Sequence, residues 1–161
     1  MAATFQWSES NGAGEVVTDG ISHLNFGNND SYNLNVDTYP IPRGQNSYIK
    51  YLRGKFSGTF TEISNIKFWK YSGAYVSGEE IKAAANATFA TPVKTASGDA
   101  IIPTTEGGAL SLNSAEGASV ILDISGVSGY TGYIRLQLQT TISSPSGDVN
   151  QKTFTLGYDE I

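Results

Sequence analysis

Residues 132–142 read GYIRLQLQTTI, and this stretch decides the fold class. Ile134, Leu136 and Leu138 occupy every second position, and polar side chains fill the positions between them. Such alternation predicts a β-strand with one face in the core and the other in water. The run at 151–158 alternates in the same way, and the turn-forming sequence SSPSGD between the two runs predicts that they form a hairpin.

Further strands are expected over most of the chain. Residues 47–60 form a long candidate in which Gly54 and Gly58 predict a bulge or bend. Its inward-facing residues are expected to be Tyr48, Leu52, Phe56 and Phe60. The remaining strands are predicted at 4–7, 21–26, 63–71, 86–93, 109–112 and 119–124, while 28–42 is expected to be a structured surface loop.

Composition supports an all-β protein. Gly, Ser and Thr together make up 51 of the 161 residues, and glycine or proline interrupts almost every stretch that is long enough for a helix. The sequence GEEIKAAA at 78–85 is the exception, so we expect at most one short helix there. The prediction is a single domain, residues 1–161, folded as an antiparallel β-sandwich of about eight strands with jelly-roll or immunoglobulin-like topology.

Several classes of function are disfavoured. The absence of cysteine excludes disulfide scaffolds, cysteine-bound zinc, iron–sulfur clusters and thiol catalysis. The net charge of −5 argues against a nucleic-acid partner, because binding a polyanion requires a basic surface. Neither a long apolar segment nor a secretory signal pattern is present, so we expect synthesis in a cytoplasm and no membrane span.

Catalysis is not expected either. His23 is the one histidine, and its alternating surroundings favour a hydrogen-bonded strand histidine. The Gly-x-Ser-x-Gly elbow of serine hydrolases and the phosphate-binding loop are both missing. The sequence therefore predicts no enzyme and no cofactor. Oxygen ligands at 28–30 and 147–150 leave calcium binding open.

One aromatic group is the candidate contact surface. Trp69 and Tyr71 share a strand face, with Tyr75 shortly after and Lys67 shortly before. Lys67, Trp69, Tyr71 and Tyr75 could form a subunit interface, stack on a sugar, or pack inside the protein. The same region is basic: seven of the ten Lys and Arg residues lie within 43–82, whereas 1–37 carry five acids and no Lys or Arg. These charges belong either to solvated strand faces or to faces that pair between subunits.

Several short strings along the chain are familiar from one group of proteins. They are LNFG at 24–27, TYPI at 38–41, NSY at 46–48, FSGTF at 56–60, IKFWK at 66–70, LQLQTT at 136–141 and KTFTLGYDE at 152–160. Taken together, they resemble small virion structural proteins of tailed bacteriophages. The likeness covers most of the chain and includes no catalytic signature.

This resemblance implies a β-sandwich displayed in many copies on a phage particle, most plausibly as a capsid decoration or cement protein. A tail or neck component is the near alternative, and a carbohydrate-binding or receptor-adhesion module is the alternative from another class. The implied partners are the major capsid or tail protein and further copies of the chain, with no nucleic acid and no membrane. The implied location is the virion, after synthesis in the host cytoplasm without a signal peptide.

Overall fold

The structure is a computed structural model that describes residues 3–112, 124–147 and 150–161. This part of the chain contains nine β-strands and a three-residue 3-10 helix, η1 (Glu106–Gly108), and every strand pairing is antiparallel. The strands are β1 (Thr4–Asn11), β2 (Val16–Asp19), β3 (Lys50–Ser72), β4 (Glu79–Asn86), β5 (Ala100–Ile101), β6 (Leu110–Ser111), β7 (Ile124–Tyr130), β8 (Tyr133–Thr140) and β9 (Thr153–Glu160). The expected all-β antiparallel fold is confirmed.

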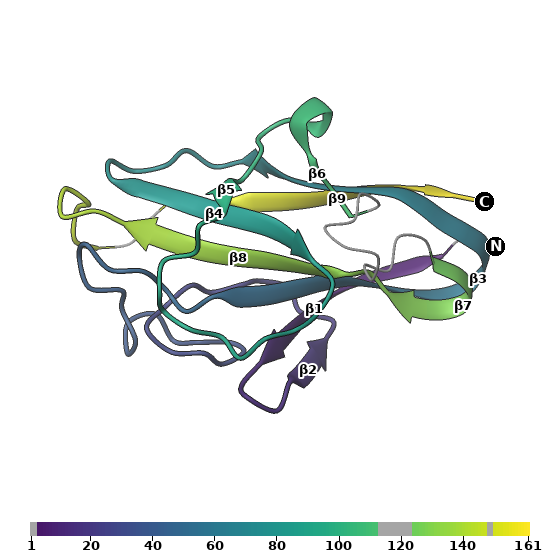
Figure 1. Ribbon diagram of the computed structural model, residues 1–161, viewed down its shortest axis with the longest axis horizontal. Helices are drawn as coiled ribbons and strands as arrows, with labels where there is room; N and C mark the ends of the chain where they lie inside the picture. The colour runs from purple at the N-terminus through teal and green to yellow at the C-terminus, as the bar shows by residue number, and fades with distance from the viewer. Residues whose placement is uncertain (1–2, 113–123, 148–149) are drawn as a thin grey trace.

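The 23-residue strand β3 organises the whole sheet (Figure 1). Its N-terminal half pairs with β1 on one edge and with β8 and then β7 on the other. Its C-terminal half pairs with β9 and β6. In Figure 1, β3 bends near the two chain ends and runs back across the molecule, so its halves lie in different layers of a sandwich-like fold.

Both halves of β3 contribute to one hydrophobic core. Leu52, Phe56 and Phe60 come from the first half, and Ile66 and Phe68 from the second. The expected inward residues of β8, namely Ile134, Leu136 and Leu138, join the same cluster. Tyr48, which was also expected to face inward, lies before β3 and is only half-buried.

The irregularity predicted at Gly58 is present, but the predicted boundary between two separate strands is not. The two runs expected at 47–60 and 63–71 form one continuous strand. Gly58 has φ +99°, and the pairing with β7 shifts register between Ser57 and Phe60, so this glycine does mark an irregularity. Gly54 lies in regular register opposite Trp7 of β1, whereas on the other edge the pairing partner changes from β8 to β7 between Leu52 and Lys55.

The predicted hairpin between 132–142 and 151–158 is also wrong. β8 pairs with β3 and β4, whereas β9 pairs with β3. Alternation determines which side of a strand is apolar, and it does not determine the neighbouring strand.

The possible helix at 78–85 is a strand. Every residue of β4 pairs with β8, and the buried Ile81 and Ala83 alternate with more exposed neighbours. Pairing along the full length of β8 overrides the helix propensity of this alanine-rich segment.

Two other predicted strands do not form. Residues 21–26 belong to no strand, and of 86–93 only Asn86 does. The predicted strand at 119–124 lies outside the described residues except for Ile124, which begins β7. Residues 28–42 form no strand, as expected for a loop. No helix in the described ranges is long and apolar enough to cross a membrane.

Candidate functional site

Three of the four candidate contact residues share the outer face of β3. Lys67, Trp69 and Tyr71 occupy alternate positions, while the intervening Phe68 and Lys70 are buried on the other side. Trp69 is half-buried, and Tyr71 is 69% exposed. We call the surface formed by Lys67, Trp69 and Tyr71 the β3 outer face.

A glycine on the neighbouring strand makes room for the indole ring. Lys67 lies opposite Gly157 of β9, and Trp69 lies opposite Thr155. Two carbons of the Trp69 six-membered ring are 3.2 and 3.3 Å from the place that a Gly157 β-carbon would occupy. The ring therefore covers the glycine, where a side chain would lift it away from the sheet.

Tyr75 is separated from the other three residues. It follows β3 and packs against the hydrophobic core, and its hydroxyl oxygen accepts a hydrogen bond from the Ile81 backbone N–H at 3.3 Å. The ammonium groups of Lys70 and Lys152 lie 5.0 and 5.5 Å from the ring centroid. Burial raises the pKa of the Tyr75 phenol. Tyr75 thus belongs to a partly buried cation–aromatic group and not to the β3 outer face.

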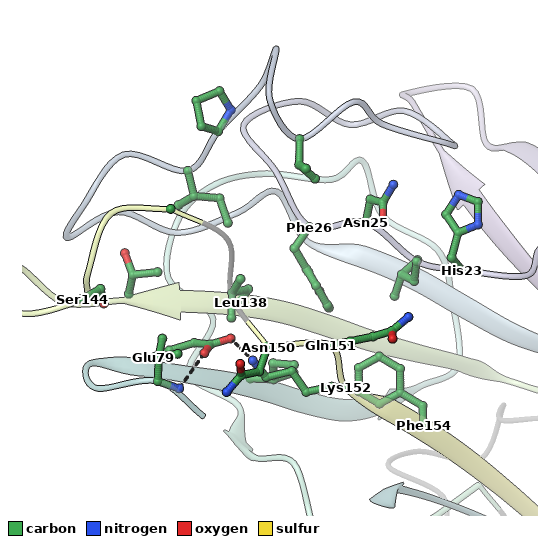
Figure 2. A pocket seen from close by; sticks show the side chains of 18 of the residues that line it. His23, Asn25, Phe26, Glu79, Leu138, Ser144, Asn150, Gln151, Lys152 and Phe154 are labelled. Carbon is green, nitrogen blue, oxygen red and sulfur yellow. Dashed lines mark hydrogen bonds and ion pairs between the residues drawn. The ribbon is translucent and has the colours of Figure 1, made fainter. Parts of the chain in front are cut away.

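A cleft of about 1070 Å³, not predicted from the sequence, opens on another side of the molecule (Figure 2). The loop that follows β2 forms one wall, from which Phe26 points inward. Leu138 and Phe154 lie on the opposite side. The cleft depends on where a long loop packs, and the local sequence pattern carries no signal for that placement.

A buried ion pair forms part of the cleft wall (Figure 2). Lys152 Nζ lies 2.5 Å from Glu79 Oε1, and the other Glu79 oxygen accepts the Val76 N–H at 3.0 Å. The two side chains are 6% and 1% exposed. Their opposite charges balance, so this pair adds no net charge to the wall.

His23 also lines the cleft, and both of its ring nitrogens have side-chain partners. Its Nε2 is 2.8 Å from Asn33 Oδ1, and its Nδ1 is 3.1 Å from Ser22 Oγ. The imidazole is exposed and stacks on Tyr32 with 6.4 Å between centroids. Both ring nitrogens are hydrogen-bonded, as expected, although the residue lies in a loop and not in a strand.

One of the oxygen-bearing residues considered for calcium, Asp30, is hydrogen-bonded to protein donors. Asp30 accepts hydrogen bonds from the Asn11 side chain and the Gly12 backbone. Among the described residues, no three His, Cys, Asp or Glu side chains are arranged to hold a metal ion. The second candidate stretch, 147–150, includes two residues outside the described ranges.

Comparison of the chain with family models, curated proteins and solved structures finds no match. Function therefore has to be inferred from the surfaces and contacts of the chain itself.

The acidic N-terminal region and the basic middle region pair within the chain. Lys50 lies 2.8 Å from Glu9 and 3.9 Å from Asp30, and Lys55 lies 2.5 Å from Asp19. Opposite charges that are separated in the sequence thus come together because β1, β2 and the following loop pack beside β3. These lysines are not free to form a basic patch for another subunit.

Proposed function

We propose that this chain is a structural protein of a tailed-bacteriophage particle and that it binds a neighbouring virion protein through the β3 outer face. The observation that carries the proposal is the exposure of Tyr71 on the same face of β3 as Trp69, two positions away. Tryptophan and tyrosine are enriched at the centres of protein interfaces because they bury a large area with little loss of conformational freedom.

Lys67 suits the rim of such a contact. Its ammonium group is 3.9 Å from Glu106, and its side chain remains 34% exposed. A weak, solvent-accessible ion pair can exchange for a carboxylate of a partner at little cost. The contact we propose thus has an aromatic centre and a cationic edge.

Attachment to the capsid as a decoration or cement protein is the placement we favour, and a tail or neck position is the alternative. The resemblance of the strings LNFG, FSGTF, IKFWK and KTFTLGYDE to phage virion proteins supports both. A stable contact to the shell needs on the order of 1,000 Å² of buried surface, so we expect the partner to cover β9 as well as β3.

The test is binding of purified protein to particles that lack it, measured by co-sedimentation. We expect near-stoichiometric binding to a major shell or tube protein, weakened at least about tenfold by the double substitution Trp69→Ala, Tyr71→Ala, because aromatic hot spots contribute 2 kcal/mol or more. Tyr39→Ala, which alters an exposed tyrosine in a loop, is the matched control and should bind like the wild type. Recovery of the protein only as a free monomer in infected lysate would contradict the proposal.

Carbohydrate binding is the second candidate, and the position of Trp69 over Gly157 favours it. An indole ring held against a sheet can stack on the apolar face of a sugar, and Tyr71 extends the same surface. A glycan array distinguishes the two functions. Specific glycan binding that Trp69→Ala abolishes without unfolding the protein would support the sugar-binding function over assembly.

A further inference from the structure

A second group of chemically reactive side chains lies far from the β3 outer face, beneath the loop that contains Asp30. Glu9 and Asn11 come from β1, and Lys50 is the first residue of β3. Lys50 is 0% exposed, Glu9 1% and Asn11 7%. Because Ser10 lies opposite Tyr51, the next position along the two strands places Asn11 beside Lys50.

One carboxylate oxygen contacts both an amine and an amide nitrogen. Glu9 Oε1 accepts a hydrogen bond from Lys50 Nζ at 2.8 Å and another from Asn11 Nδ2 at 2.8 Å. Both distances lie within the range required for proton transfer by a general acid or base. The carbonyl oxygen of Asn11 is buried and has no hydrogen-bond partner.

We propose that Lys50 and Asn11 form an intramolecular isopeptide bond and that Glu9 transfers the protons. The Lys50 ammonium gives one proton to Glu9, and the resulting amine attacks Cγ of Asn11. A bond forms between Nζ and Cγ, and the attacking nitrogen passes a second proton, through Glu9, to Nδ2 as the bond between Cγ and Nδ2 breaks. Nδ2 leaves as ammonia, and Glu9 keeps one proton. No oxidant or further reactant is needed.

The burial of the group favours this reaction. A charged lysine and a charged glutamate are costly to bury, and the reaction replaces them with a neutral amide and a neutral carboxylic acid. The fold already holds nucleophile, amide and proton carrier together, which removes most of the entropic cost of bringing them into contact. The oxygen of the new amide is Asn11 Oδ1, which has no hydrogen-bond partner before the reaction. The protonated Glu9 can then donate a hydrogen bond to it.

Lys50 Nζ also donates a hydrogen bond to the Ser31 backbone oxygen at 3.0 Å, but among the nearby side chains Asn11 is a better electrophile than Asp30. Asp30 lies 3.9 Å from Lys50 Nζ, and its two oxygens accept hydrogen bonds from Asn11 Nδ2 and Gly12 N–H. A carboxylate resists attack by an amine more strongly than a carboxamide does, because it carries a negative charge. Asp30 instead accepts a hydrogen bond from the departing nitrogen of Asn11, which Glu9 also contacts.

The chain contains a natural comparison. Lys152 and Glu79 form another buried Lys–Glu pair, but the described contacts of Glu79 include no side-chain amide. A buried ion pair alone should therefore not react, and only the group that includes Asn11 should become cross-linked.

The test is the intact mass of the purified full-length chain after denaturation. We expect a deficit of about 17 Da, one ammonia, relative to the sequence, together with a proteolytic fragment in which Lys50 is joined to Asn11. Glu9→Gln should restore the full mass, because glutamine cannot carry the proton. Glu79→Gln, the matched variant at the other buried pair, should retain the deficit.

The sequence Asn11-Gly12 offers another route to the same mass, since an asparagine before glycine can lose ammonia by cyclising onto its own backbone. Lys50→Arg separates the two routes, because it keeps the positive charge and removes the nucleophilic amine. If the deficit persists in Lys50→Arg, or if the wild-type chain has its full sequence mass, the isopeptide bond is excluded. A deficit of about 18 Da with Lys50 joined to Asp30 would overturn the assignment to Asn11.

Discussion

The indole ring of Trp69 lies over Gly157 on the adjacent strand. The nearest ring carbons are 3.2 and 3.3 Å from the point where a β-carbon on residue 157 would lie. These distances are shorter than ordinary van der Waals contact, so even one methyl group at residue 157 must move the ring. Trp69 is on the outer side of the sheet and can move outward. The glycine therefore sets the shape of the β3 outer face more than it sets the stability of the fold.

Gly157→Ala should shift Trp69 toward solvent. We expect its fluorescence emission to move to longer wavelength and binding to the particle to weaken, with a change in unfolding free energy below about 1 kcal/mol. Trp7 is the other tryptophan, so the measurement uses a Trp7→Phe background. Gly14→Ala, where no atom lies within 4 Å of the new methyl group, is the control and should leave emission unchanged.

Gly78→Ala should be strongly destabilising. Gly78 has φ +76°, and a β-carbon there would lie 2.3 Å from Thr141 Oγ1 and 2.9 Å from the Ser144 backbone nitrogen. Backbone strain and overpacking together predict a loss of about 2–4 kcal/mol in denaturant unfolding. Gly98→Ala meets no atom within 4 Å and should be neutral or stabilising by up to about 1 kcal/mol. Equal effects for the two variants would refute this explanation.

Phe68→Ala should remove a central part of the core. Phe68 is fully buried and contacts Trp7 and Phe154, with ring centroids 6.0 and 5.7 Å away. Loss of the ring should lower the unfolding free energy by about 3–5 kcal/mol, because the cavity cannot fully collapse. Ile142→Ala is the control: this residue is 78% exposed, and its loss should change the unfolding free energy by less than about 0.5 kcal/mol. A small effect of Phe68→Ala would show that the two layers do not share this core.

Tyr133 should be among the last tyrosines to ionise. Burial and a hydrogen bond to Glu15 raise its pKa from 10.0 to about 12. A pKa that is higher in the folded state contributes stability that is fully present below pH 10.0 and is lost as the pH rises toward about 12. Phenolate absorbance should therefore show a component near pH 12 that Tyr133→Phe removes. An identical titration curve for the variant would argue against this assignment.

Strand faces were predictable from the sequence, and strand partners were not. In β8 the residues Ile134, Leu136 and Leu138 are buried as their alternation predicts. Yet β8 lies between β3 and β4 and does not pair with β9. A period of two is a property of one strand, whereas pairing depends on long-range packing that the local pattern does not encode.

The candidate contact residues were partly predictable for the same reason. The common face of Trp69 and Tyr71 follows from their spacing, whereas Tyr75 lies beyond the end of β3 and turns toward the core. Neither the cleft beside Glu79 nor the group around Lys50 could be predicted from a local sequence pattern, because each combines residues that are far apart in the chain.

The sequence by itself determined an all-β, cysteine-free chain, the apolar faces of its main strands, and a bend at Gly58. These properties follow from local sterics and from the burial of alternate side chains. Tertiary structure alone decided that 78–85 is a strand, that acidic and basic regions pair inside the chain, and that Glu9 touches both Lys50 and Asn11. Such contacts arise only when β1, the Asp30 loop and β3 pack together, and the free energy of that packing exceeds the local preferences of each segment.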